Sequence, residues 1–352
     1  MKRPVIFIGG DHALPELFDE LAIEMKARGC EVIRGWAAPP PKPTEYPREE
    51  WPRLFGQADV IVITVRTRAP RALLEAAPRL RAVVFPTIGT ESVDLADAQE
   101  LGLAIGHGPT PENFTGMAES TVMLIAALFL DLAEKERLTR FSLPRPAQKT
   151  MKARLVRGKT IGLVGLGRIA RAVVDRLSGW DTRIIAFDPY VSKEDAPDDV
   201  ELVNMPTLLR ESDLVSLHVT LTKETRHLIG ARELAQMKPT AYLINTSRGG
   251  AVDEQALFDA LQNNKLAGAA LDVFDKEPLP PDSPLRGLDN VILTSHIVGH
   301  VSEMHDSFLH AAIENISRVL RDEPPLYMRN PEALPAWRKR LERLGRLTLE
   351  VS

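Results

Sequence analysis

A glycine-rich turn near the middle of the chain restricts the fold more than any other feature of the sequence. The apolar run at residues 161–164 leads into Gly165-Leu166-Gly167-Arg168-Ile169-Ala170, and an amphipathic stretch continues from there to Leu177. This order is typical of a strand, a tight turn and a helix whose first backbone N–H groups are open to an anion. A parallel sheet must surround such a turn, because the helix returns the chain to start the next strand.

Short apolar runs recur on both sides of this turn, separated by stretches with helical periodicity. After it they lie at residues 183–187, 214–218, 242–244, 267–271 and 291–293, and before it at 5–8, 60–65, 82–85 and 103–105. Longer helices are predicted at residues 16–28, 113–132 and 301–320. The pattern predicts an α/β protein with two Rossmann-like domains, each a doubly wound parallel sheet.

The final long helix is expected to return to the first domain, which would make that domain discontinuous. We therefore expect a first domain whose first part is residues 1–110 and whose return helix lies in residues 299–330. The domain that carries the glycine-rich turn, residues 111–298, would be inserted into it. Residues 331–352 are expected to form a C-terminal extension, a short basic helix with a frayed end.

Composition excludes several classes of partner. The chain carries 44 Lys and Arg against 48 Asp and Glu, so no basic surface for nucleic acid or anionic membrane is expected. The longest apolar run, residues 122–130, is too short to span a bilayer, and no export signal is seen. Cys30 has no partner for an internal disulfide, which fits a cytoplasmic location, and no metal-ligand spacing is present.

An acidic residue follows the turn at the spacing that a dinucleotide site requires. Asp188 ends the run at residues 183–187 and lies 18 residues after Ala170. A carboxylate there can accept hydrogen bonds from the ribose hydroxyls and would repel a 2′-phosphate. The sequence therefore favours NAD over NADP, although Lys193 leaves NADP use open. The alternative is a glycine-rich turn that binds nothing, followed by a surface Asp.

Three side chains suited to chemistry lie at or just beyond strand ends. They are Arg248 before Gly249-Gly250, Glu277 before Pro278, and His296 after the run at residues 291–293. Ligands of open α/β sheets bind outside the carboxyl ends of the strands, so these positions are expected to converge. Taken singly, an arginine or glutamate at such a position is more often a surface turn residue, and a histidine is more often a structural residue at a strand end whose ring nitrogens are hydrogen-bonded.

At this point the sequence resembles the NAD-dependent D-2-hydroxyacid dehydrogenases. The resemblance runs from about residue 80 to residue 330 and rests on motifs in the family's order. They are Gly-Lys-Thr-Ile-Gly-Leu-Val-Gly-Leu-Gly-Arg-Ile at 158–169, Phe-Asp-Pro-Tyr at 187–190, the Arg248 motif, Glu277-Pro278 and His296-Ile297. The set implies reversible hydride transfer between NAD(H) and a D-2-hydroxy acid or its 2-oxo acid.

The resemblance also implies roles for individual residues. His296 would be the general acid/base, Glu277 would orient it, and Arg248 would bind the substrate carboxylate. Cofactor contacts are implied at the turn and around the active site, at Gly165, Gly167, Arg168, Ile169, Asp188, Thr246, Asp272 and His296. Asp272 would hydrogen-bond the nicotinamide carboxamide.

Further implications concern the substrate loop and the assembly. Ile88 and Gly89 would bind the substrate with their backbone amides, and the helix at residues 113–132 would lie at the domain junction and in a homodimer interface. The resemblance makes residues 1–110 and 299–330 a flavodoxin-like substrate domain and residues 111–298 the NAD-binding Rossmann domain. The active site is expected between the two domains.

Alternatives from other classes stay open. The chain could be an NAD(H)-sensing binding protein, like the corepressors that share the fold, or a dehydrogenase of another small anion such as formate or phosphite.

Overall fold

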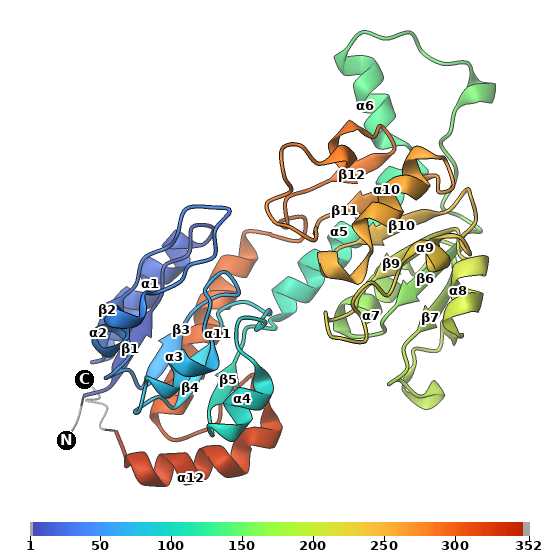
Figure 1. The fold of residues 1–352 in the computed structure, drawn as a ribbon. Coiled ribbons are helices and arrows are strands. Elements are labelled where there is room, and N and C mark those ends of the chain that lie inside the picture. The colour runs from blue at the N-terminus through green and yellow to red at the C-terminus, as the bar shows by residue number, and fades with distance from the viewer. Residues whose placement is uncertain (1–2, 348–352) are drawn as a thin grey trace. The chain divides into compact units, whose positions relative to one another are not determined.

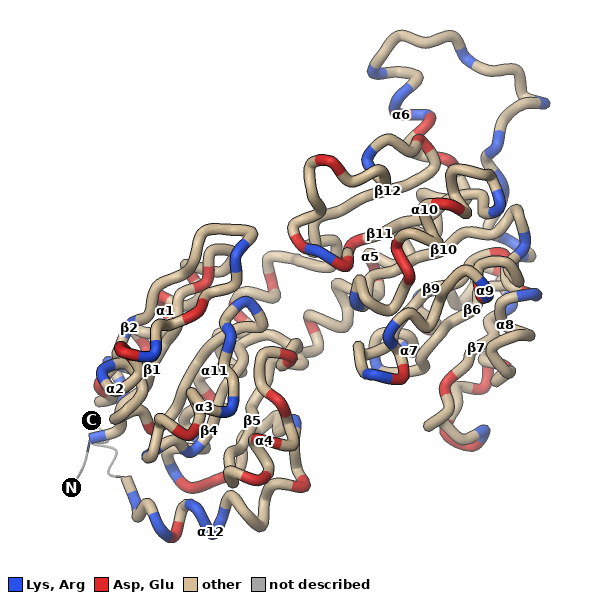
Figure 2. The backbone as a smooth tube through the Cα atoms, viewed as in Figure 1, with Lys and Arg blue, Asp and Glu red and all other residues tan. Residues whose placement is uncertain are grey.

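The computed structural model describes residues 3–347, which divide into two compact units (Figure 1). Unit 1 contains the described residues up to Glu112 and from Val301 onward, and unit 2 contains Asn113–His300. Unit 1 is therefore built from two separate stretches of the chain. Figure 2 shows that basic and acidic residues are interspersed over both units.

Unit 1 is a parallel sheet with helices on both faces. In the described residues the sheet has five strands, in the order β2-β1-β3-β4-β5. The strands are β1 (Val5–Ile8), β2 (Glu31–Arg34), β3 (Val60–Val62), β4 (Ala82–Val84) and β5 (Ala104–Gly106). One face is covered by α1 (Pro15–Ala27), α11 (Glu303–Leu320) and α12 (Leu334–Leu344), and the other by α2 (Trp51–Leu54), α3 (Arg71–Glu75) and α4 (Leu95–Glu100). This strand order is that of flavodoxin-like folds.

Unit 2 is a larger sheet of the same kind. Over the described part of the chain it has seven parallel strands, in the order β12-β11-β10-β9-β6-β7-β8. The strands are β6 (Thr160–Val164), β7 (Arg183–Phe187), β8 (Val200–Leu202), β9 (Leu214–Leu217), β10 (Tyr242–Asn245), β11 (Gly268–Leu271) and β12 (Val291–Leu293). One face packs against α5 (Pro111–Phe129) and α7 (Arg168–Leu177), the other against α8 (Met205–Glu211), α9 (Ala231–Leu234) and α10 (Glu254–Gln262). The order matches a dinucleotide-binding sheet with one added strand.

Helical and strand periodicities explain these layers. The buried residues of α7 are Ala170, Val173, Val174 and Leu177, a spacing that places all four on the face toward the sheet. The central strands β1, β9 and β10 are buried along their whole length, as strands covered on both faces must be. Short 3-10 turns complete the connections at Arg48–Glu50, Gln148–Thr150, Lys193–Asp195, Gly249–Ala251, Pro284–Gly287 and Pro331–Ala333.

The predicted helix at residues 113–132 is wrong at its end. α5 stops at Phe129, Asp131 takes the left-handed conformation with φ of 54°, and α6 (Leu132–Arg140) starts in a new direction. The bend between the two helices is 67°. Among the described residues no single helix is long and apolar enough to cross a membrane, and only this bent pair reaches that length and composition.

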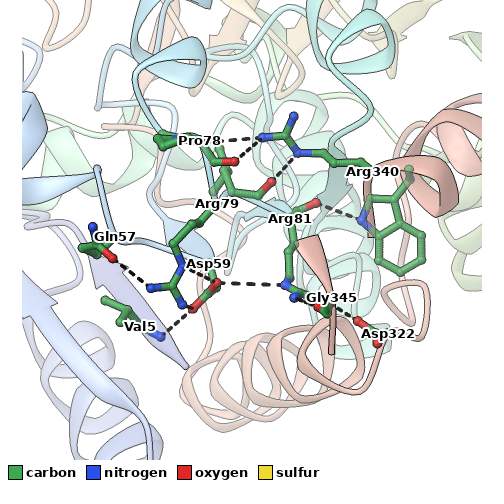
Figure 3. A network of polar contacts seen from close by, with 12 residues as sticks. Val5, Gln57, Asp59, Pro78, Arg79, Arg81, Asp322, Arg340 and Gly345 are labelled. Carbon is green, nitrogen blue, oxygen red and sulfur yellow. Dashed lines mark hydrogen bonds and ion pairs between the residues drawn. The ribbon is translucent and has the colours of Figure 1, made fainter. Parts of the chain in front are cut away.

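The C-terminal extension docks on unit 1 through α12. Trp337 is 1% exposed, and its indole N–H donates to the backbone oxygen of Arg81 at 2.9 Å. Arg81 is itself buried and forms an ion pair with Asp322 (Figure 3), while Arg340 donates to the backbone oxygen of Leu80. The short basic helix expected here therefore belongs to the core of unit 1, and only residues 348–352 of the expected frayed end lie outside the described part.

Candidate active site

The glycine-rich turn has the geometry of an anion-binding loop. Gly165 has φ of +89°, and a Cβ atom there would meet the backbone oxygen of His218 at 2.7 Å, so only glycine fits. Among residues 3–347, no heavy atom outside Gly167 and its two chain neighbours lies within 4 Å of a Cβ atom built on Gly167, which leaves open space over the turn. Arg168 and Ile169 are the first residues of α7, so their backbone N–H groups belong to its unbonded first turn.

Asp188 is tied to this turn. Its carboxylate accepts hydrogen bonds from the N–H of Leu166 and from the N–H of Tyr190, both at 2.9 Å. The acid at the end of β7 is thus fixed beside the glycine-rich turn, where a ribose would follow the phosphates. The turn and this acid fit a dinucleotide such as NAD, which would be held by backbone amides at one end and read by the carboxylate at the other.

His296 and Glu277 are brought together although 19 positions separate them in the sequence. His296 Nδ1 lies 2.7 Å from Glu277 Oε2, and Glu277 Oε1 accepts a hydrogen bond from the N–H of Phe274. Burial raises the pKa of the Glu277 carboxyl, but its hydrogen bond and charge interaction with His296, aided by Arg248, bring the pKa below its ordinary value. Glu277 is therefore an ionised acceptor at neutral pH.

The backbone at His296 is in an uncommon conformation that a buried acid supports. His296 has φ of +60°. The Oδ1 atom of Asp272 accepts hydrogen bonds from the Thr294 hydroxyl at 2.7 Å and from the N–H groups of Ile297 and Val298 at 3.1 and 3.2 Å. Non-glycine residues at positive φ persist only where their surroundings hold them, and they cluster at functional sites. Sequence reasoning missed this contact, because it depends on how β11 and the loop after β12 meet.

Arg248 follows β10 in a loop stiffened by Asn245. The Asn245 side chain donates to the backbone oxygen of Arg248 at 2.9 Å, and Arg248 Nη1 donates to the backbone oxygen of Ser247. Thr246, predicted to contact the cofactor, is buried in the same loop. The loop after β10 adjoins the one after β11, which carries Glu277, because the two strands pair in parallel.

The predicted substrate loop lies in unit 1, after β4. The backbone oxygen of Ile88 accepts a hydrogen bond from His107 Nδ1 at 3.0 Å, and Gly89 follows directly. Sequence reasoning missed a polar cluster at the same sheet edge, formed by Asp11, Thr64 and Arg66. The signal that could have found it is that each of the three follows a strand end.

Across residues 3–347 no group of three or more His, Cys, Asp or Glu side chains could hold a metal ion. The groups described for the site are the glycine-rich turn, the His296–Glu277 pair and Arg248.

Comparison with known proteins places this set of residues in a family. Residues 122–298 match the model of the D-isomer specific 2-hydroxyacid dehydrogenase NAD binding domain. The chain is 36% identical over 351 residues to a glyoxylate reductase of Thermofilum pendens, covering 95% of this chain and 96% of that protein. It is also 36% identical over 308 residues to a D-3-phosphoglycerate dehydrogenase of Methanocaldococcus jannaschii, covering 86% of this chain and 57% of the other.

A solved structure of similar fold carries a cofactor. The NAD-dependent formate dehydrogenase of Staphylococcus aureus, in complex with NAD, superposes with a TM-score of 0.76 and 26% identity, covering 92% of this chain and 97% of that one. The two parallel sheets, the matched domain and the 36% identity to the glyoxylate reductase lead to one assignment. The chain belongs to the D-isomer specific 2-hydroxyacid dehydrogenases and is an NAD-dependent oxidoreductase of that family.

Proposed function

We propose that the chain interconverts a small D-2-hydroxy acid and its 2-oxo acid, with His296 as the general acid/base, Glu277 as its partner and Arg248 binding the substrate carboxylate. The observation that carries this proposal is the 2.7 Å contact between His296 and Glu277 on a histidine held at positive φ. The similarity to a glyoxylate reductase and a phosphoglycerate dehydrogenase supports a short 2-oxo acid as substrate.

The His–Glu pair determines which ring atom moves the proton. An ionised Glu277 accepts the Nδ1 hydrogen of His296, so Nε2 is the atom that gives a proton to the C2 oxygen in reduction and takes it back in oxidation. Arg248 carries a permanent charge and can present parallel N–H donors to a carboxylate, which would fix C2 in place. NAD(H), when bound, supplies or accepts the hydride.

Cofactor choice follows from Asp188. A carboxylate held by two backbone N–H groups cannot turn away from a 2′-phosphate, so we propose that NAD is preferred to NADP. Residues Gly165, Gly167, Arg168, Ile169, Thr246 and Asp272 are proposed to complete the cofactor site.

We further propose a homodimer built on α5, α6 and the segment after them. Figure 1 shows α6 and this segment extending away from the rest of unit 2. They carry large exposed apolar side chains, namely Met123, Leu130, Leu132, Phe141, Leu143, Met151 and Leu155. Sedimentation of a Phe141→Glu/Leu155→Glu double variant should show a smaller particle than the wild type, and an unchanged particle would contradict this interface.

The test of the activity is NADH consumption with glyoxylate, pyruvate, hydroxypyruvate and 2-oxoglutarate, with NADPH as the competing cofactor. His296→Ala should abolish turnover while NADH still binds, and His310→Ala, an exposed histidine of α11, should behave as the wild type. Reduction of none of these acids would overturn the proposal. Oxidation of formate or phosphite would then favour the other-anion alternative, and NADH binding without any turnover would favour the sensor.

A further inference from the structure

An aromatic ring and a guanidinium meet beside the glycine-rich turn of unit 2. Arg168 is the first residue of α7, and Phe114 lies in the first turn of α5. The Arg168 Cζ atom lies 5.3 Å from the centre of the Phe114 ring, within the distance of a cation–π interaction. Arg168 is exposed, and in the part of the chain that the structure describes its guanidinium has no other hydrogen bond or ion pair. Its N–H donors are therefore available to an anion at the turn.

The ring is held in place because the following two turns of α5 are fixed. Phe114, Met117 and Ser120 are spaced three residues apart, so they lie along one side of the helix. The Ser120 hydroxyl donates to the backbone oxygen of Val298, and Met117 packs so closely on Gly299 that a Cβ atom there would clash with its sulfur. These contacts with the loop after β12 fix the rotation of α5 about its axis. The Phe114 ring is thus a fixed platform for the guanidinium.

The other two arginines of α7 are occupied in a different way. Arg171 Nε donates to the backbone oxygen of Leu166 at 3.1 Å, and Arg176 forms an ion pair with Glu119 of α5 at 3.3 Å. An aromatic ring, in contrast, attracts a cation through its face and accepts no classical hydrogen bond. Arg168 is therefore restrained by its partner while its hydrogen-bond donors stay unused.

We propose that Phe114 is a positioning residue for the cofactor, because it holds the Arg168 guanidinium at the glycine-rich turn in place to bind the diphosphate of NAD(H). The inference rests on the proposed function only in that the turn is the site of NAD(H), and it does not depend on which acid is reduced. A long side chain loses rotamer freedom when it binds a ligand, and one that is restrained beforehand loses less. Since backbone N–H groups of the turn would bind the same anion, Phe114 adjusts the affinity rather than creating it.

The experiment measures the affinity of the full-length chain for NADH by fluorescence titration. Phe114→Leu removes the ring but keeps an apolar side chain, and it should raise the Kd for NADH about 2- to 10-fold. Phe114→Tyr keeps an aromatic face and should stay within about twofold of the wild type. Phe258→Leu, which removes a half-buried ring from α10 on the other face of the sheet, is the matched control and should leave the affinity unchanged.

Two further comparisons show whether Phe114 acts through Arg168. Arg168→Gln should weaken NADH binding at least as much as Phe114→Leu does, and combining the two should cause no further loss, because the ring then has no cation to hold. The loss in Phe114→Leu should also appear with ADP-ribose, which has the diphosphate, and should be absent with adenosine, which lacks it. Both of these ligands are measured by competition with NADH, and thermal unfolding checks that each variant is folded.

The outcomes separate this inference from the function on which it rests. An unchanged NADH affinity in Phe114→Leu overturns the inference alone. An equal loss with adenosine, or a full further loss when Phe114→Leu is added to Arg168→Gln, also overturns it, because Phe114 would then act by packing. A wild type that does not bind NADH overturns the cofactor site and this inference together. A wild type that binds NADH but reduces no 2-oxo acid overturns only the proposed reaction.

Discussion

Replacing Asp272 by asparagine separates two roles for its carboxylate. In the structure Oδ1 accepts three hydrogen bonds from the loop that carries His296, whereas the family resemblance implies a contact with the nicotinamide carboxamide. Hydrogen bonds to a charged acceptor contribute about 1.5–3 kcal/mol each and neutral ones about 0.5–1.5 kcal/mol. The substitution therefore removes about 1 kcal/mol from each bond, or about 3 kcal/mol of the free energy that holds the loop.

That free energy opposes the backbone strain at His296. A non-glycine residue at positive φ costs about 1–3 kcal/mol, so a loop held about 3 kcal/mol less firmly can leave this conformation. Each loss of about 1.4 kcal/mol shifts the equilibrium between the correct and the relaxed loop conformation tenfold toward the relaxed one. Allowing part of the loss to fall on overall stability, we expect kcat in Asp272→Asn to fall about 10- to 100-fold while NADH affinity stays within about threefold.

Two measurements decide the result. Initial rates from NADH absorbance give kcat, and fluorescence titration gives NADH affinity. Asp275→Asn, three positions along the same segment and exposed, is the control and should change neither quantity. An unchanged kcat together with about tenfold weaker NADH binding would refute the role of Asp272 in holding the loop and would support the nicotinamide contact instead.

Three further substitutions test other parts of the molecule. Gly165→Ala places a Cβ atom 2.7 Å from the His218 backbone oxygen and should weaken NADH binding about tenfold in the same titration. The control Gly158→Ala has φ of +72° but open space around its Cβ atom, so it should bind NADH normally. Equal effects of the two substitutions would contradict the clash. Trp337→Ala leaves a cavity at a buried position and should lower the free energy of unfolding by about 3–5 kcal/mol, which calorimetry should register as a fall of about 10 °C in the unfolding temperature of unit 1. A fall of less than about 2 °C would mean that α12 is not part of the core. The pKa of Asp11 lies below its ordinary value of 3.8, so its ionised form stabilises the fold above that pH, and this contribution is lost as the pH falls through the folded-state pKa. Urea unfolding should therefore show Asp11→Asn less stable than the wild type near neutral pH, with the difference vanishing in acid. A difference that does not depend on pH would contradict the ionised state of Asp11.

The fold was largely predictable because its central strands are continuous apolar runs. The strands missed by sequence reasoning are β2 and β8, both at sheet edges. In β2 no residue is fully buried and its ends are Glu31 and Arg34, and β8 has a glutamate between two apolar residues. An edge strand has one neighbour and a partly solvated surface, so it lacks the hydrophobic signal of a central strand. The overlong helix prediction at residues 113–132 failed at Asp131, whose left-handed backbone no apolar pattern indicates.

The candidate site was predictable where residue types carry the chemistry and not where contacts depend on register. Glu277 and His296 were expected to meet because both follow strands of one sheet, and they lie 2.7 Å apart. The three hydrogen bonds to Asp272 and the cluster of Asp11 with Arg66 could not be derived. Both depend on which loops adjoin at a sheet edge, and strand order is not readable from a single sequence.

The split of unit 1 into two stretches affects how the protein is made. The Asn330 side chain donates a hydrogen bond to the backbone oxygen of Leu103 and accepts one from the N–H of Ile105. The Trp337 indole donates to the backbone oxygen of Arg81. Partners more than 220 positions apart in the sequence therefore complete this unit. The ribosome synthesises all of unit 2 before Asn330 and Trp337, so unit 2 could fold before α11 and α12 of unit 1 have been made. During that interval β4 and β5 lack the helices that cover one of their two faces, and that apolar face would be exposed to chaperones.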